Sequence, residues 1–341
     1  MAGAPLSANR RLTEAADIHS RIHGQKKEAD LLHSQARWER ARIDAHAAAN
    51  LISTSLAAIT AKYSRYRTPG DLEGNVEVTS RHVQTNDEPW LVALQELGGA
   101  DCGVWFPRSE MTTLAADLVE ILADPTVESA VPEVASGATR TIFGIHRLRR
   151  SFELLAKNGR LVSAAETILG EPVYLYQSKL NPKDPGSHGW DWHVDFQAWS
   201  RDDGMPEPRA VTFAVYIDDV TSDAGPLTVL GGSHTYFGSW GLAEAKPVGD
   251  GDGSAAWRAD FGVDLKYAPP RDFVAKLLRE CPEVPLPGTS GSVMAFLAAT
   301  VHGSASNGSS NRRAVVYLTY NAESNRPRLA DMKRPPFIVE R

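Results

Sequence analysis

The pattern of apolar and polar residues changes along the chain, and its N-terminal part is typical of helices. Between residues 25 and 68 there is no Gly and no Pro, and Ala, Glu, Arg, Leu and Gln are frequent, which favours helix. Apolar residues such as Leu31, Trp38 and Ile43 recur at roughly helical spacing, so one face is expected to be buried. We therefore predict a helical N-terminal extension over residues 1–70, packed on the main domain or joining two copies in a homo-oligomer.

A stretch with Pro and Gly at residues 67–78 separates this extension from a region of mixed pattern. Residues 109–124 have apolar positions at helical spacing, and residues 151–170 predict two short helices that break near Asn158. Another helix is expected around residues 273–279, inside a long insert between predicted strands.

From residue 171 onward the chain consists of short segments rich in β-branched and aromatic residues, bounded by Gly, Pro, Asn or Asp. Such segments predict strands, and few helices of useful length separate them, so the sheets should be antiparallel. We expect residues 71–341 to form one mainly β domain, a sandwich or barrel with flanking helices. The predicted strand segments are residues 171–181, 209–218, 225–234, 290–304 and 312–321.

Composition and charge narrow the function classes. The 341 residues are 42% hydrophobic and 23% charged, as in an ordinary globular protein. The net charge of −6 argues against nucleic acid or an anionic membrane as a partner. No apolar run is long enough to span a membrane, the first residues lack the apolar core of a secretory signal, and two Cys fit a reducing compartment. We expect a cytoplasmic protein whose partner is a small molecule.

Candidate metal chemistry lies in the segment WHVDFQAW, residues 192–199. In an extended segment, residues two apart face the same side, so His193 and Asp195 can approach one metal. That pair alone is a weak signal, but His302 closes a later predicted strand. Two His and one carboxylate form the facial triad of non-haem Fe(II) oxygenases, which leaves coordination positions open for a 2-oxo acid and for dioxygen.

A candidate for binding the 2-oxo acid follows the second histidine. Arg313 lies eleven residues after His302, on the next predicted strand, and a guanidinium is well shaped to hold the far carboxylate of 2-oxoglutarate. Arg312 is the rival. Adjacent strand residues face opposite ways, so only one of the two arginines can enter the barrel, and the spacing favours Arg313.

The segments that carry this chemistry resemble the phytanoyl-CoA dioxygenase family, especially its bacterial branch of ectoine hydroxylase and free amino acid hydroxylases such as leucine 5-hydroxylase. The resemblance lies within residues 171–325, in the segments WHVDFQAW, DGMP, GPLTVLGGSH, VHGS and NRRAVVYLTYN. It implies a double-stranded β-helix, a jelly roll of cupin-like form, that holds Fe(II) through His193, Asp195 and His302. It also implies that 2-oxoglutarate and O2 are consumed, with release of succinate and CO2, while an unactivated C–H bond is hydroxylated.

The resemblance also suggests site residues beyond the metal ligands. Arg313 would bind the 2-oxoglutarate carboxylate. No further catalytic residue is implied, and the carboxylate of Asp195 favours hydroxylation over halogenation, because related halogenases carry a small residue there. The remaining candidates are Thr212, Gln177 and Ser304 near the co-substrate and Trp199 and Asn181 near the substrate. Asp202 and Asp203 are expected in a solvated turn, with contact to a cationic substrate as the alternative.

The resemblance favours a small polar substrate, a free L-amino acid or a close derivative. Ectoine and a natural-product biosynthetic intermediate, free or carrier-bound, are the alternatives. A hypothesis of another class is a non-catalytic jelly-roll protein that binds a ligand or a metal without turnover.

Overall fold

The computed structural model of the chain describes residues 88–133, 136–237, 257–258, 261, 265–327 and 334–340. These residues belong to a compact unit that spans His82–Arg341. The expected helical extension over residues 1–70, its proposed part in oligomerisation and most of the insert before residue 265 lie outside the described residues. The domain boundary near residue 70 therefore stays a prediction.

Two antiparallel sheets form the body of the described unit. The large sheet has the strand order β1-β9-β6-β11-β4-β3-β2, and the small sheet has the order β5-β10-β7-β8. The large sheet contains β1 (Gly99–Val104), β2 (Ala130–Pro132), β3 (Thr139–Phe143), β4 (Val173–Lys183), β6 (Ala210–Tyr216), β9 (Ser292–Leu297) and β11 (Arg313–Ala322). The small sheet contains β5 (Trp190–His193), β7 (Leu227–Leu230), β8 (Glu283–Leu286) and β10 (His302–Ser304).

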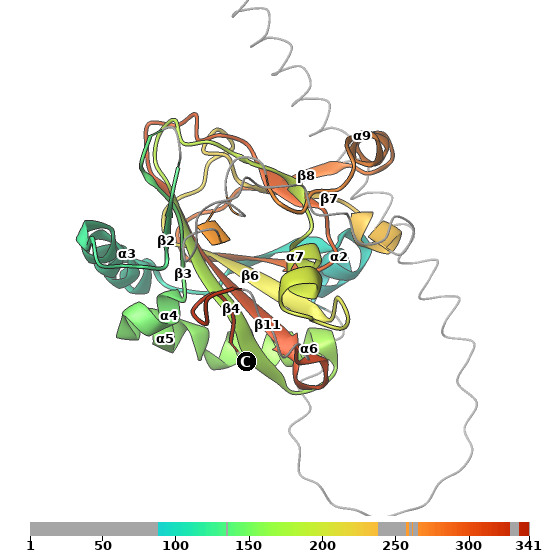
Figure 1. Ribbon diagram of the computed structural model, residues 1–341, viewed down its shortest axis with the longest axis horizontal. Helices are drawn as coiled ribbons and strands as arrows, with labels where there is room; N and C mark the ends of the chain where they lie inside the picture. The colour runs from blue at the N-terminus through green and yellow to red at the C-terminus, as the bar shows by residue number, and fades with distance from the viewer. Residues whose placement is uncertain are drawn as a thin grey trace, which may run out of the picture. The chain divides into compact units, whose positions relative to one another are not determined.

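Helices cover the outer face of the large sheet. A continuous apolar core joins Leu118 of α3, Phe152 of α5 and Leu161 of α6 to Phe213 and Leu318 of the sheet. In Figure 1, α3 to α6 lie along the left and lower part of the view, beside β4 and β11. The helices are α2 (Pro89–Leu97), α3 (Arg108–Ala123), α4 (Ile145–Leu148), α5 (Arg150–Ala156), α6 (Gly159–Leu169), α7 (Asp195–Asp202) and α9 (Arg271–Glu280), with 3-10 turns at Ser233–Tyr236 and Glu323–Asn325.

This helical layer corrects one expectation. The fold was expected to be mainly β, but it is a mixed α and β fold built on two antiparallel sheets. The physical reason is the outer face of the large sheet, which is apolar and needs a cover. Strand β11 shows this, because all ten of its residues are buried and alternate residues face the helices and the space between the sheets.

Most predicted elements are confirmed, and one strand is placed differently. The two helices α5 and α6 break at Asn158, whose side chain accepts a hydrogen bond from the Arg160 N–H and caps α6. The segment 290–304 was expected to be one strand closed by His302. It forms two strands instead, β9 in the large sheet and β10 in the small sheet, because the chain turns at Thr300, whose hydroxyl donates to the Gly98 carbonyl at 2.7 Å.

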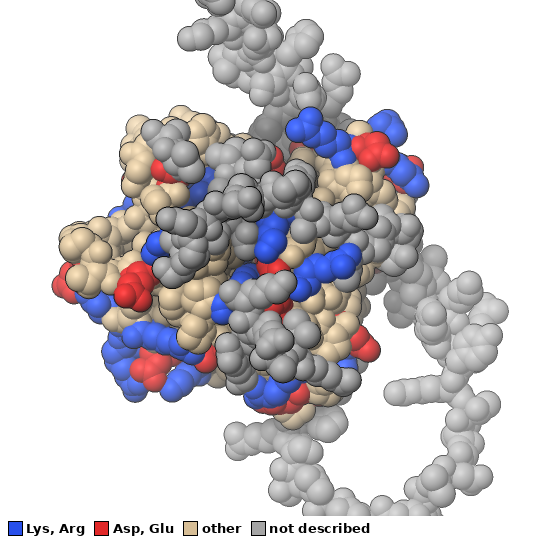
Figure 2. Space-filling model, in the orientation of Figure 1, with Lys and Arg blue, Asp and Glu red and all other residues tan. Residues whose placement is uncertain are grey.

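The visible surface of the described unit carries mixed charge. Figure 2 shows Lys and Arg side chains interspersed with Asp and Glu, over α9 at the upper right and near α4 and α5 at the lower left. On α5 the arrangement is explicit, since Glu153 pairs with both Arg150 and Lys157. Among the described residues, no helix is long and apolar enough to cross a membrane.

Candidate active site

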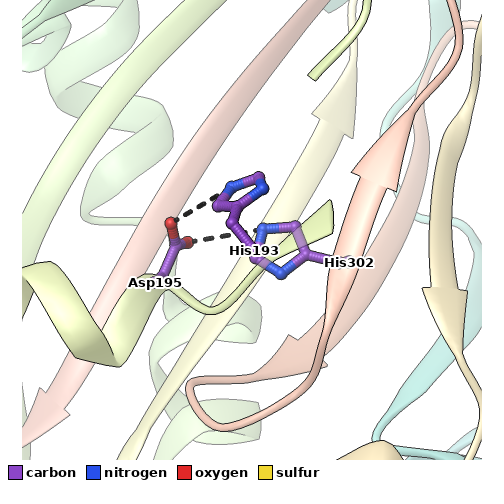
Figure 3. Close-up of side chains that lie close together, drawn as sticks. All are labelled: His193, Asp195 and His302. Atoms are coloured by element: carbon purple, nitrogen blue, oxygen red, sulfur yellow. Dashed lines mark ion pairs between the residues drawn. The ribbon is translucent and has the colours of Figure 1, made fainter. Parts of the chain in front are cut away.

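The three predicted metal ligands meet at one end of the small sheet. His193 is the last residue of β5, Asp195 is the first residue of α7, and His302 is the first residue of β10, where it pairs with His193 across the sheet. Their side chains point toward one another (Figure 3), and one ligand atom from each lies within 4.8 Å of the other two. The His-x-Asp pair does not lie on a single strand as expected. The strand ends at His193, and the turn into α7 brings Asp195 back to the same side.

Backbone carbonyls orient both imidazole rings. The Nδ1 of His193 lies 2.6 Å from the Asp191 carbonyl oxygen, and the Nδ1 of His302 lies 3.0 Å from the Thr300 carbonyl oxygen. A carbonyl accepts only, so each Nδ1 carries the proton and each Nε2 presents a lone pair. Such outer contacts fix the orientation of metal-binding imidazoles.

The charge state of the cluster is that of a metal site. Burial lowers the pKa of His193 to about 3, with the neighbouring His302 as the next cause, and burial also lowers the pKa of His302. Burial raises the pKa of Asp195, but the Lys179 ammonium at 3.6 Å and the two imidazoles bring it down to about 2. The imidazole Nε2 atoms lie 3.7 Å and 3.8 Å from the carboxylate oxygens of Asp195 (dashed in Figure 3). At neutral pH none of these atoms carries a proton, so each presents a lone pair that a metal ion can accept.

This arrangement fits a divalent iron ion. The Oδ2 atom of Asp195 is buried and has no hydrogen-bond partner among the described residues, a costly state for a carboxylate unless a cation is bound. Two neutral imidazoles and one carboxylate on one side of a metal are the ligands that non-haem Fe(II) uses.

Arg313 lies on the inner face of β11, as its spacing predicted. Its side chain has no exposed surface, and its Nε and Nη1 atoms have no partner among the described residues. Its Nη2 donates to the Tyr317 hydroxyl at 3.5 Å. Arg312 points to the outside and pairs with Asp218 at 3.0 Å. A buried guanidinium with unused donors is suited to an anion.

Thr212 and Gln177 lie on the same inner face, deeper in the large sheet. The hydroxyl of Thr212 lies 2.9 Å from that of Thr319 on β11, and Gln177 is opposite Thr319 on β4. Both side chains are buried. The structure thus places both candidates on the barrel side of the sheet that carries Arg313.

Two cavities meet at the metal cluster. The first, here named the sheet cavity, is lined by residues of β4, β5, β7, β9, β10 and β11. The second, named the helix cavity, is lined by α7, β3, the segment 265–267 and Arg334. Lys179, Trp190 and His193 line both. The guanidinium of Arg140 stacks on Trp190 at 3.9 Å from the ring centroid, which fixes this shared wall.

Ser304 and Asn181 both line the sheet cavity. Ser304 accepts a hydrogen bond from the Lys183 Nζ at 2.8 Å. Burial, and then the nearby charge of Arg313, lower the pKa of Lys183 to about 6. The contact of Asn181 with substrate stays a prediction, and alternation along β4 puts Asn181 on the same face as Gln177 and Lys183.

Trp199 is placed in the core. It is 2% exposed and packs edge-on against Tyr176, with ring centroids 5.3 Å apart. It is absent from the described lining of both cavities, whereas its neighbour Ala198 lines the helix cavity. The structure thus gives Trp199 a packing role, and its contact with substrate stays a prediction.

The expectation of a solvated turn at Asp202 and Asp203 is wrong. Asp202 is 4% exposed and lines the helix cavity, and Asp203 is fully buried. Asp203 is held by Arg334 and by the Tyr176 hydroxyl. Asp202 ends α7 and Asp203 follows it, and their basic partners, Lys266 and Arg334, come from segments more than sixty residues away in sequence.

Lys179 is a site residue that the sequence reasoning missed. Its ammonium lies 3.6 Å from Asp195 and 5.5 Å from the ring centroid of Tyr317. A signal was present, because Lys179 lies between Gln177 and Asn181 and shares their face by strand alternation. The cluster of Lys266, Tyr267 and Arg334 was also missed, and these residues carry no pattern that would have found them.

An antiparallel two-sheet barrel with two His and one carboxylate at its strand ends defines the class of non-haem iron oxygenases. Residues 103–315 match the phytanoyl-CoA dioxygenase family, and the chain belongs to it. L-proline trans-4-hydroxylase from Streptomyces griseoviridis is 37% identical over 212 residues, 62% of this chain and 77% of that protein. Ectoine dioxygenase from Bordetella bronchiseptica is 34% identical over 276 residues, 77% of this chain and 83% of that protein.

Solved structures agree with the family. The crystal structure of EctD from S. alaskensis with 2-oxoglutarate and 5-hydroxyectoine has a TM-score of 0.62 to this chain at 29% identity, covering 81% of this chain and 93% of that one. The same enzyme with bound Fe gives a TM-score of 0.61 at 30% identity, covering 75% of this chain and 85% of that one. The chain is accordingly a 2-oxoglutarate-dependent dioxygenase, a hydroxylase that uses iron, 2-oxoglutarate and O2.

Proposed function

We propose that this enzyme hydroxylates an unactivated C–H bond of a small zwitterion, a free L-amino acid or a close derivative. One observation carries the proposal: the helix cavity, which reaches the metal ligands His193 and Asp195, is lined by groups of both charges. Asp202 supplies the negative group, and Lys266 and Arg334 supply positive ones. A cavity with fixed charges of both signs favours a molecule that carries both.

The rest of the helix cavity wall is apolar and aromatic. Phe143, Trp190, Phe261 and Leu265 line it together with Tyr267. Such a wall excludes water and holds the hydrocarbon part of a small molecule, while the charged groups set its orientation. When bound, iron together with 2-oxoglutarate and O2 supplies the oxidising power that converts C–H to C–OH. The protein's part is to present one C–H bond to that centre.

The co-substrate is assigned to the inner face of the large sheet. We propose that Arg313 binds the far carboxylate of 2-oxoglutarate with its unused donors, with Thr212 and Ser304 as neutral partners and Gln177 beside it. The burial of Arg313, Thr212 and Gln177, the position of the half-buried Ser304 and the guanidinium atoms of Arg313 without a partner among the described residues support this assignment. Asn181, whose buried Oδ1 lacks a partner among the described residues, belongs to the same group.

The named relatives support the substrate class. L-proline and ectoine, the compounds in their names, are both small and carry a carboxylate and a cationic nitrogen group. Ectoine is therefore the nearest alternative substrate, and a biosynthetic intermediate with the same two charges is another. The family assignment leaves no support for a non-catalytic binder.

The proposal is tested by a succinate-release screen with purified enzyme, Fe(II), ascorbate and 2-oxoglutarate. The compounds are the standard L-amino acids, L-proline derivatives and ectoine, with mass spectrometry for a product 16 mass units heavier, the mass of one added oxygen. We expect substrate-dependent succinate and a hydroxylated product with at least one free amino acid. Succinate release that none of these compounds stimulates would refute the proposal and favour a larger biosynthetic intermediate.

A further inference from the structure

The helix cavity contains an ion pair that we infer to be the substrate's recognition site. Asp202 and Lys266 face each other across it. We propose that a zwitterion inserts between them, so that its ammonium group takes the place of Lys266 on Asp202 and its carboxylate pairs with the Lys266 ammonium. This inference rests on the proposed function and names the residues that would select the substrate.

Helix α7 sets the position of this pair relative to the metal. Asp195 is the first residue of the helix and Asp202 the last, and a separation of seven residues is close to two turns, so both lie on one face. Their Cα atoms are roughly 10 Å apart at about 1.5 Å of rise per residue. Both carboxylates line the helix cavity. The space between them has the length of one small molecule.

The contacts of Asp202 are those of a loosely held pair. The Lys266 Nζ lies 3.3 Å from each of the two carboxylate oxygens, longer than the 2.7–2.9 Å that is typical of charged hydrogen bonds. The Lys266 side chain keeps 24% of its surface exposed, whereas that of Asp202 keeps 4%. Lys266 can therefore move toward solvent while Asp202 stays in place.

The neighbouring pair provides a contrast. Asp203 accepts from the Arg334 Nε at 2.9 Å and from its Nη2, and the Tyr176 hydroxyl donates to the same carboxylate. The side chains of Arg334 and Asp203 are 3% and 0% exposed. Each group of this pair is thus buried against its counter-charge, although Arg334 also borders the helix cavity. Of the two acids in adjacent positions, Asp202 has the partner that a ligand can replace.

Tyr267 keeps Asp202 in position during the exchange. Its hydroxyl donates to the Oδ1 atom of Asp202 at 2.7 Å. A phenol is a neutral donor at physiological pH, so this bond does not compete with an ammonium group for the charge of the carboxylate. The second carboxylate oxygen is left to meet the substrate.

The exchange selects against compounds with one charge. A zwitterion returns to Asp202 and to Lys266 the opposite charge that each gives up in the exchange, whereas a molecule without its ammonium or its carboxylate returns only one of the two. Losing a charged contact in this way is costly, above all for the buried Asp202, and sites of this kind discriminate strongly between analogues.

The test compares three probes in four proteins. The first probe is L-proline, or the amino acid with the strongest response in the succinate screen. The second is the N-acetyl derivative of that amino acid, which lacks the ammonium charge, and the third is its carboxamide, which lacks the carboxylate. The proteins are wild type, Asp202→Asn, Lys266→Met and the conservative Lys266→Arg. Circular dichroism and thermal midpoints check folding, and KM, kcat and probe binding by calorimetry are measured separately.

Each variant is expected to lose discrimination against one analogue only. Asp202→Asn raises KM for the free amino acid about 10- to 100-fold, the effect of a lost charged hydrogen bond, with kcat nearly unchanged, and no longer rejects the N-acetyl derivative. Lys266→Met has a similar effect on KM but no longer rejects the carboxamide. Lys266→Arg restores most of the affinity for the free amino acid.

Matched controls lie outside the cavity. Asp218→Asn and Arg312→Met break an ion pair next to the start of β11, whose cation is about as exposed as Lys266 and whose acid is more exposed than Asp202, and we expect both to keep the wild-type ranking of the three probes. Equal losses for all probes in Asp202→Asn and Lys266→Met, or unchanged KM in either, would overturn the inference. If the wild type responds to no amino acid in the screen, the proposed function itself fails, which is a different result.

Discussion

The sheet cavity and the helix cavity share three wall residues but are built in different ways. The sheet cavity is lined by strands of the two sheets. Apart from the shared residues, the helix cavity is lined by β3, α7, Phe261, residues 265–267 and Arg334, most of which lie outside the sheets and far apart in sequence. The difference separates the two tasks of the enzyme. The chemistry common to the family lies on rigid strands, and selection of the substrate falls to segments that can vary without disturbing the sheets.

The largest effect is expected where the two cavities meet. Replacing Asp195 by Ala removes one of three metal ligands and the only carboxylate of the cluster. We expect iron binding to fall below detection at micromolar iron and succinate release to drop by more than about 1,000-fold. Each factor of ten in affinity or rate corresponds to about 1.4 kcal/mol. Iron content after desalting and turnover check this. The exposed Asp184→Ala is the control, and retention of iron by Asp195→Ala would contradict the assignment.

The next effect concerns the stability of the helix cavity. Asp203→Asn leaves the buried guanidinium of Arg334 without its counter-charge, and breaking a buried pair from one side costs about 3–5 kcal/mol. Urea denaturation should show this loss in the free energy of unfolding. Glu323→Gln breaks the exposed pair with Arg326 and should change little. Similar midpoints for the two variants would show that the Asp203 pair does not hold α7 in place.

A somewhat smaller effect is expected at Arg313, which contacts Tyr317 in the wall of the sheet cavity. Arg313→Met removes the unused donors on the inner face of β11, so KM for 2-oxoglutarate should rise about 100-fold, as expected for one partner of a buried charge pair. KM for the amino acid should change little, because the helix cavity is intact. Arg312→Met, at the residue directly before this strand and paired with Asp218 on the outside, is the matched control. Equal effects of the two substitutions would remove Arg313 from the co-substrate site.

The smallest effect is a dependence of stability on pH that comes from Lys183, whose Nζ donates to Ser304 in the wall of the sheet cavity. Burial lowers the pKa of Lys183 to about 6 in the folded protein, whereas an unfolded Lys titrates near 10.4. Between these values the unfolded chain binds one more proton, so the free energy of unfolding rises with pH by up to about 1.4 kcal/mol per unit.

Denaturation curves at pH 7, 8 and 9 test this contribution. Lys183→Met should show a shallower rise of stability with pH than wild type, because the residue that gains a proton on unfolding is gone. Lys157→Met on the exposed face of α5 should keep the wild-type slope. Parallel lines for wild type and Lys183→Met would mean that Lys183 stays charged in the folded protein.

The same contrast explains what could be predicted from sequence. His193, Asp195, His302 and Arg313 follow from strand alternation, from spacing and from the chemistry of iron ligands, and the structure brings the three metal ligands together. Strand alternation also contained the information for Lys179. These residues are fixed by local geometry, which a single sequence shows directly.

The helix cavity could not be predicted because its contacts are long-range. Asp202 and Lys266 are 64 residues apart, and Asp203 and Arg334 are 131 residues apart. Two adjacent acids before a Gly are typical of a solvated turn, and only the fold shows that both are buried. Trp199 of α7 shows a similar limit. Sequence reasoning places this residue at the substrate, whereas its ring packs against Tyr176 in the core.

The geometry of α7 limits how the enzyme can change its substrate. One inserted or deleted residue between Asp195 and Asp202 would rotate one carboxylate by about 100° relative to the other. A change of length there would turn the Asp202 side chain away from the helix cavity, while the three iron ligands would keep their positions. New specificities in such a scaffold should therefore arise by exchange of side chains within a helix of constant length, with insertions confined to the segments that approach it from outside.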